Sequence, residues 1–371
     1  MGDTGFDLET MVSVCPVAYN LYKAHGCDDV LSAFNIANHL HLHGFLKEAA
    51  AFYQRALILR LADPEGHPRP ELLLQVKLLC LIKAQEKVDE EELNFLKKLS
   101  VPLYNYILGV MKYYRNNITA IEALKIIGNS FEEFHTGEEI DAINMKLIYE
   151  CLEKGVFPNK IRKKTIPRQM FFYWDQNIPQ DVSENIDHHK EFKSFKVELF
   201  DKVKAADWLH QYYGRDAQSI FLKARHPAEA ADILRVHVIY LYGGFWVDAD
   251  LKVTSEEVFN QNIPLNYSEV FMLTDGYFVH NDFFGCAAQS TILEDCLLSI
   301  YRNCYNYEGL FISYKTGPGV FMRALNRTYY RCLDGISKDF PFTKILNQAV
   351  FDKVTQQYPV SYKQFGTWTA A

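Results

Sequence analysis

The chain has 371 residues, a length that predicts two domains and a core large enough to fold without disulfides or metal ions. Apolar residues make up 49% and charged residues 23% of it, which excludes a disordered, collagenous or coiled-coil protein. The formal net charge of −7 and the lack of a long basic run argue against nucleic acid as a partner. A phosphate-bearing small ligand stays compatible, because it needs only a local site.

No stretch reaches the roughly 18 apolar residues that a membrane-spanning helix needs. The first residues are acidic where a signal peptide carries positive charge. Eight cysteines are scattered without a C-x-x-C pair, so we expect free thiols. These features predict a protein without a transmembrane segment that stays in the cytoplasm or is exported as an effector.

Residues 1–158 predict an all-helical domain. Apolar residues recur at helical spacings, as at Leu93, Leu96 and Leu99. Turn-forming residues separate the expected helices at Gly26, at 63–66, at 100–102 and at 128–130. The pattern predicts six or seven helices with short connections.

One segment of this domain, HGFLKEAAAFYQRAL (residues 43–57), resembles a single tetratricopeptide (TPR) hairpin. Gly44, Ala49, Tyr53 and Ala56 stand where that repeat uses small and aromatic residues to pack two helices. No second copy occurs at a period of about 34 residues, so we expect no array. Two roles stay open: a helical bundle packed on the rest of the chain, or a module that binds a partner or acceptor.

From Ile161 onward, short β-rich runs alternate with helical stretches. The expected strands are 169–174, 195–200, 245–247 and 270–273, and the expected helices include 205–213, 228–242 and 291–301. This alternation predicts an α/β domain over residues 159–371 with its ligand site at strand ends.

The helix expected over residues 228–242 carries Asp232 and Arg235. Pro227 suits its first turn, and the pair Gly243-Gly244 ends it. Asp232 and Arg235 share one helix face, since three residues separate them. A structural ion pair explains them as well as a functional role does.

Asp248 and Asp250 follow the short aromatic strand 245–247. The two-residue period of a strand places both carboxylates on one face. Neighbouring carboxylates repel each other, and Mg²⁺ or Mn²⁺ relieves that repulsion while leaving room for substrate phosphates. Ordinary turns after strands also carry such a pair, so the spacing alone does not decide.

The ordered string A-D-I-L-R-x₆-Y-G-G-F-W-V-D-A-D (residues 231–250) resembles the sugar-nucleotide signature of DXD glycosyltransferases. It is similar to glycosyltransferase family 32, which includes yeast mannosyltransferases and bacterial capsule enzymes. A more distant likeness is to the glucosyltransferase domains of large clostridial toxins.

Further segments resemble the same family. IPRQMFFYW (166–174) resembles its opening strand, with Trp174 in the position that lies by the nucleotide base. Two phenylalanines, Phe171 and Phe172, replace the family's His-Gln. KTGPGVFMRAL (315–325) resembles the segment that turns close to the donor.

Two other matches are partial. Asn281 and Asp282 resemble the family's Asn ahead of a strand of small residues, and a plain turn explains them nearly as well. FGTWTAA (365–371) carries Thr367 and Trp368 where the family has its closing G-S-W, and lacks the His that often precedes it.

The resemblance covers about residues 165–368 and implies a GT-A glycosyltransferase domain with a mixed, Rossmann-like sheet. It implies a UDP- or GDP-linked sugar as donor, a glycan, lipid-linked or protein acceptor, and retention of the anomeric configuration. Asp248 and Asp250 would hold Mn²⁺ or Mg²⁺, and Asp232 and Arg235 complete the expected catalytic set. The residues implied to bind the nucleotide sugar are Trp174, Asp232, Arg235, Gly243, Gly244, Asn281, Asp282, Gly317, Pro318, Thr367 and Trp368.

A second interpretation is a helical adaptor whose glycosyltransferase-like domain binds a nucleotide sugar without turnover. The intact set Asp232, Arg235, Asp248 and Asp250 favours an enzyme, because a decayed site usually loses its acidic residues first. Within the enzyme class, a bacterial capsule or surface-glycan enzyme and an exported effector both stay open.

Overall fold

The computed structural model describes residues 8–63, 65–128, 130, 139–157, 164–337 and 340–359. The chain forms two compact units, residues 1–133 and 134–371. The sequence predicts the boundary later, after residue 158. The difference arises at α10 (Glu139–Glu153), which packs on α18 (Pro318–Leu333) and β7 (Thr343–Leu346) of the second unit.

The first unit is helical in its described residues, as predicted. Its helices are α1 (Leu8–Val12), α2 (Pro16–His25), α3 (Val30–Leu42), α4 (Leu46–Ala62), α5 (Pro70–Lys83), α6 (Glu90–Leu99), α7 (Val101–Tyr114) and α8 (Ala120–Ile127). Predicted turn residues end or begin several of them: Gly26 ends α2, Ser100 caps α7 and Gly128 ends α8.

The segment 43–57, which resembles a TPR hairpin, covers the turn after α3 and most of α4, and α3 and α4 pack against each other. Ala49, Tyr53 and Ala56 are buried on α4, and the Tyr53 hydroxyl donates a hydrogen bond to Asn38 Oδ1 at 2.7 Å. The likeness of this hairpin to a TPR repeat stays a prediction.

The second unit is a mixed α/β domain around a six-stranded sheet in the order β2-β1-β3-β6-β5-β7. β1 pairs in parallel with β2 and β3, β5 pairs in parallel with β7, and β6 is antiparallel to both β3 and β5. A second, two-stranded sheet joins β4 and β8. The strands are β1 (Gln169–Tyr173), β2 (Lys196–Phe200), β3 (Gly244–Val247), β4 (Leu251–Val253), β5 (Glu269–Met272), β6 (Phe283–Cys286), β7 and β8 (Thr355–Gln357).

Four of these strands, β1, β2, β3 and β5, match the strands expected from the sequence, and no end differs by more than one residue. The remaining helices are α11 (Gln180–Lys190), α12 (Lys202–Tyr213), α13 (Arg215–Leu222), α14 (Pro227–Tyr242), α15 (Glu256–Asn262), α16 (Thr291–Asn306), α17 (Ile312–Lys315) and α19 (Gln348–Val354). The three expected helices correspond to α12, α14 and α16.

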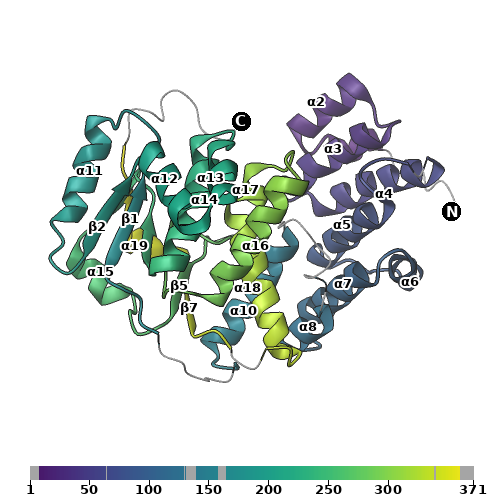
Figure 1. Cartoon of the computed structure of the whole chain (residues 1–371). Coiled ribbons are helices and arrows are strands. Elements are labelled where there is room, and N and C mark those ends of the chain that lie inside the picture. The colour runs from purple at the N-terminus through teal and green to yellow at the C-terminus, as the bar shows by residue number, and fades with distance from the viewer. Residues whose placement is uncertain are drawn as a thin grey trace. The chain divides into compact units, whose positions relative to one another are not determined.

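Both faces of the sheet are covered at β1 and β3, which explains why β3 is apolar throughout and β1 is apolar from Met170 onward. Met170, Phe172, Phe245 and Val247 join a core with residues of α11, α15 and α19. Trp246 lies on the opposite face, where α14 packs across β1, β3 and β6. Figure 1 shows α11 beside β2 and the helices α12 to α14 gathered over the sheet.

No helix among the described residues is long and apolar enough to cross a membrane. All eight cysteines carry free thiols, and seven of them are buried.

Candidate active site

A cavity of about 760 Å³ opens at the edge of the sheet where β1 and β3 end and β6 begins. Ligand sites of α/β proteins usually lie at such an edge, and the volume suits a small-molecule ligand. Eight of the residues predicted from the sequence line it: Trp174, Asp232, Arg235, Asp248, Asp250, Asn281, Asp282 and Pro318.

The acidic pair lies in a turn, not at the end of a strand as the sequence predicts. β3 ends at Val247 and β4 begins at Leu251, whose N–H donates to the Asp248 carbonyl oxygen at 2.9 Å. The turn forms because β4 leaves the main sheet and pairs with β8. Both Asp248 and Asp250 line the cavity.

Asp248 continues the alternation of β3 and lies on the same face as Trp246. The Trp246 indole N–H donates to Asp248 Oδ1 at 2.7 Å. Arg235 Nη2 lies 3.0 Å from Asp248 Oδ1, and the Arg235 guanidinium covers the Trp246 ring at 5.4 Å from its centroid. One indole and one guanidinium therefore fix the orientation of this carboxylate.

Asp232 is the second carboxylate held from several sides. Its Oδ1 accepts a hydrogen bond from Asn281 Nδ2 at 2.8 Å and lies 3.3 Å from Arg235 Nη2. Its Oδ2 accepts a hydrogen bond from the Thr316 hydroxyl at 3.0 Å. The side chain of Asp232 is 7% exposed, so these contacts replace most of its hydration.

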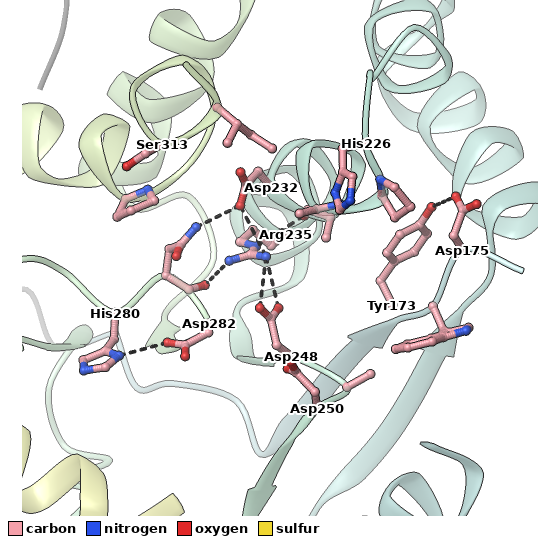
Figure 2. Close-up of a pocket in the computed structure, with 18 of the residues that line it drawn as sticks. Tyr173, Asp175, His226, Asp232, Arg235, Asp248, Asp250, His280, Asp282 and Ser313 are labelled. Atoms are coloured by element: carbon pink, nitrogen blue, oxygen red, sulfur yellow. Dashed lines mark hydrogen bonds and ion pairs between the residues drawn. The ribbon is translucent and has the colours of Figure 1, made fainter. Parts of the chain in front are cut away.

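Arg235 lies between the two carboxylates, as Figure 2 shows. Its Nε donates to the Ala231 carbonyl oxygen at 3.3 Å, and its Nη1 donates to the Asn281 carbonyl oxygen. The Arg235 side chain is 3% exposed. The ion pair with Asp232 is present, and Arg235 also lines the cavity.

Burial raises the pKa of both carboxyl groups. The pKa of Asp232 rises to about 6, although Arg235, Thr316 and Asn281 oppose the shift. The pKa of Asp248 rises to about 7, mainly through burial and further through the charges of Asp250 and Asp282, with Arg235 opposing. A cation at this edge of the cavity would relieve the shared repulsion of these carboxylates.

The loop before β6 contributes Asn281 and Asp282. The Asp282 carbonyl oxygen accepts the Asp248 backbone N–H at 2.9 Å, so this loop also supports the acidic turn. His280 Nδ1 lies 3.1 Å from Asp282 Oδ1, and His280 Nε2 lies 2.9 Å from Gln348 Oε1. Burial opposes protonation of His280, but its bonds to Asp282 and Gln348 raise its pKa above the usual value.

The opposite end of the cavity is formed by the residues that follow β1. Trp174 lines it together with Tyr173 and Asp175. The Tyr173 hydroxyl donates to Asp175 Oδ1 at 2.7 Å, and Lys202 Nζ lies 3.5 Å from the same oxygen. An aromatic ring beside a fixed carboxylate suits a nucleoside, whose base stacks and whose hydroxyl groups donate hydrogen bonds.

Gly243 and Gly244, which the resemblance implies at the nucleotide-sugar site, do not line the cavity. They lie at the start of β3, whereas the acidic turn follows its end. A Cβ on Gly243 would lie 2.7 Å from the Ala288 nitrogen, and one on Gly244 would lie 2.6 Å from Gln169 Cγ. The structure therefore gives both glycines a packing role: they let α14 end against β1 and β6.

Gly317, Thr367 and Trp368 are the remaining predicted residues, and none of them is among the described residues that line the cavity. Gly317 lies behind the cavity, where a Cβ would come within 3.3 Å of Asp232 Oδ2. Thr367 and Trp368 lie outside the described residues, so their predicted closure over the diphosphate stays a prediction.

Sequence reasoning missed several residues that orient the site. Trp246 could have been predicted, because the strand period puts it on the same face as Asp248. The sequence indicates Thr316 less directly, because it only precedes the predicted pair Gly317-Pro318. His189 stands in a polar stretch of the sequence, yet it is fully buried under β4, since α11 turns its polar side chains toward that strand.

The donor atoms at the acidic turn fit a hard divalent cation. Carboxylate oxygens are the ligands that Mg²⁺ and Mn²⁺ prefer, and Asp248 and Asp250 bring two such groups to one cavity. In the part of the chain that the structure describes, no group of three or more His, Cys, Asp or Glu side chains is arranged to hold a metal ion. The pair alone suits a cation that takes its other ligands from substrate phosphates and water.

Comparison with known proteins gives one family match. The profile of the family described as "Capsular polysaccharide synthesis protein" matches residues 144–358, a range that includes every residue lining the cavity. The solved structure of "PaToxG Glycosyltransferase" is similar with a TM-score of 0.38 and 16% identity, over 58% of this chain and 92% of that chain. A search of curated proteins finds no match.

Proposed function

The chain belongs to the capsular polysaccharide synthesis protein family, and from this premise we propose that it is a metal-dependent glycosyltransferase with a GT-A fold. The proposed donor is a nucleotide-diphosphate sugar, and the acceptor is a glycan, a lipid-linked saccharide or a protein. One observation carries the proposal: Asp232, Arg235, Asp248, Asp250 and Asn281, from three separate segments, converge on one cavity.

In this proposal Asp248 and Asp250 hold Mn²⁺ or Mg²⁺. The bound cation neutralises charge on the donor diphosphate and on the leaving nucleotide. Trp246 and Arg235 prepare this site in advance, because they fix the Asp248 carboxylate before any ligand arrives. Preorganised groups of this kind need no rearrangement during the reaction.

Asp232 and Asn281 are the proposed contacts to the donor sugar. An ionised carboxylate offers about four acceptor positions, so Asp232 keeps capacity for sugar hydroxyl groups beside its three protein partners. Arg235 favours the ionised forms of Asp232 and Asp248 and lies between them, which makes it a positioning residue at least. Retention of the anomeric configuration follows only from the resemblance to family 32.

Trp174 is the proposed contact to the nucleotide base, and its place at the cavity supports that role. Whether the base is uracil or guanine stays open, as does the acceptor. Pro318 and Gly317 bring α18 close to Asp232, which supports a role of this segment near the donor.

The test is a panel of UDP- and GDP-sugars, with binding measured by calorimetry and release of free nucleotide measured with and without Mn²⁺. We expect at least one donor to bind and to be hydrolysed slowly in a metal-dependent way. Asp250→Asn should lower the release at least ~100-fold and leave the melting temperature unchanged. Asp187→Asn, at an exposed carboxylate on α11, is the matched control and should behave like the unmodified protein.

Full release by Asp250→Asn, or in excess chelator, would reject the proposed metal-dependent reaction at Asp250. Tight binding of a nucleotide sugar without any release would instead favour the helical adaptor with a binding domain.

A further inference from the structure

The buried face of α11 is directed at the backbone of the acidic turn and β4. Asn185 is fully buried, and its Nδ2 donates to two carbonyl oxygens, those of Ala249 and Leu251, each at 2.9 Å. An amide nitrogen carries two hydrogens, so these two bonds use its whole donor capacity. The two carbonyls belong to the residues on either side of Asp250.

The carbonyl of Asp250 itself points the other way. It accepts the Tyr358 N–H, beyond β8, at 2.8 Å. The carbonyls of residues 249, 250 and 251 therefore bond to opposite sides of the chain in turn. Asn185 on one side and the β8 segment on the other therefore hold the peptide units around Asp250, a residue that lines the cavity.

His189 extends the same support by one turn of α11. The Val253 N–H donates to His189 Nε2 at 3.0 Å, so that nitrogen carries no proton. His189 Nδ1 then carries the proton and donates to the Asn185 carbonyl oxygen at 2.7 Å. His188 Nε2 donates to the Val253 carbonyl oxygen at 2.9 Å. Polar side chains of α11 thus bond to residues 249, 251 and 253 in turn.

We propose that Asn185 is a positioning residue of the candidate active site, and that α11 sets the position of Asp250 relative to Asp248. This inference rests on the proposed function for its effect on metal binding. Without Asn185 two buried carbonyls lose their donor, and the turn can move to find other partners. Residues that orient metal ligands typically change metal affinity about 10–100-fold when they are replaced.

The test compares two substitutions, Asn185→Leu, of similar volume without donors, and Asn185→Ser, which is smaller and keeps one donor. Thr343→Val is the matched control, because the buried Thr343 hydroxyl donates to Glu269 Oε2 at 2.9 Å at the other end of the sheet. All are made in the full chain. Backbone hydrogen exchange of residues 248–253 reports the turn directly, and calorimetric titration with Mn²⁺ reports the metal site.

We expect both Asn185 variants to exchange residues 248–253 at least ~10-fold faster and to need at least ~10-fold more Mn²⁺ for half-saturation. Thr343→Val should change neither. Unchanged exchange in both Asn185 variants, or equal acceleration in the control, overturns the inference. Faster exchange with unchanged Mn²⁺ affinity overturns it too.

Two further outcomes, a variant that does not fold and an unmodified protein that binds no ligand, are interpreted as follows. If Asn185→Leu does not fold, Asn185→Ser gives the result. If the unmodified protein binds neither Mn²⁺ nor any nucleotide sugar, the proposed function fails, and hydrogen exchange alone decides whether Asn185 holds the turn.

Discussion

Protons and a divalent cation would compete for the Asp248 carboxylate. Its pKa of about 7 reflects burial and the neighbouring charges of Asp250 and Asp282, against which Arg235 acts. A group with a raised pKa is protonated as the pH falls through that value, and a protonated carboxyl group is a poor metal ligand.

We therefore expect metal-dependent nucleotide release at limiting Mn²⁺ to fall as the pH drops through about 7. More Mn²⁺ should move the midpoint to lower pH, and Arg235→Gln should move it to higher pH. The measurement is a set of pH profiles at two Mn²⁺ concentrations. A midpoint that ignores the Mn²⁺ concentration would contradict competition at these carboxylates.

Two buried histidines give a separate pH effect, on stability. Burial lowers the pKa of His189 and of His237 to about 4 from the ordinary 6.5. Between these values the unfolded chain binds more protons than the folded one, so each histidine makes the fold less stable as the pH falls. Asp232 and Asp248, with raised pKa values, act in the opposite direction, and only a comparison with a variant isolates one histidine.

We expect the stability of the unmodified protein relative to His237→Gln to fall by about 1.4 kcal/mol per pH unit between those two values. Denaturant unfolding across this range measures it. His210→Gln, at an exposed side chain, is the control and should leave the pH dependence unchanged. A pH-independent difference between the unmodified protein and His237→Gln would show that His237 does not titrate in this way.

Candidate site residues could be identified from the sequence where they stand close together in one motif. Asp232, Arg235, Asp248 and Asp250 stand within 19 consecutive positions of one ordered string, and all four line the cavity. Asn185 acts on Ala249 across 64 positions, so no periodicity or spacing relates the two residues. The sequence identified these four residues of the cavity and missed Asn185, which bonds to the backbone on both sides of Asp250.

The packing of α14 against β3 depends on the short connection between them, which contains Gly243. Gly243 has a φ of 68°, and a Cβ there would meet the Ala288 nitrogen at 2.7 Å. Gly214 ends α12 with a similar φ of 86°, yet a Cβ there would meet nothing within 4 Å. The two glycines share the backbone strain and differ only in the close contact.

Gly243→Ala should therefore cost about 3 kcal/mol of unfolding free energy, and Gly214→Ala only about 1 kcal/mol. Chemical denaturation measures both values, and their difference isolates the steric part. Equal costs would mean that the chain around Gly243 relaxes, and that the tight connection does not fix α14 against β3.

Among the strands, β1 and β3 were predictable from the sequence, and β4 and β8 were not. β3 is apolar throughout and β1 is apolar from Met170 onward, since each strand is covered on both sides. β4 and β8 have three residues each and pair about 100 positions apart, which leaves no local pattern. The polar side chains on the buried face of α11 bond to backbone atoms of a distant strand, so the local sequence does not mark them as buried.

Packing determines whether α10 belongs to the helical N-terminal domain or to the domain that contains the sheet. A domain boundary after residue 158 assigns α10 to the helical domain, whereas the compact units place it with the sheet. Met145, Leu147 and Ile148 of α10 are buried, and the helix packs on α18 and β7. Just beyond it, the Phe157 ring lies 4.8 Å from that of Tyr329 on α18.

A fragment of residues 134–371 should accordingly be soluble, melt cooperatively and keep the nucleotide release proposed for the full chain. A fragment of residues 159–371 should aggregate or lose its cooperative transition, because α18 and β7 would expose the apolar surface that α10 covers. In the full chain Leu147→Ala should cost about 2–5 kcal/mol if α10 belongs to this core. If both fragments are equally soluble and melt with the same cooperativity, α10 belongs with the N-terminal helices and the sheet folds without it.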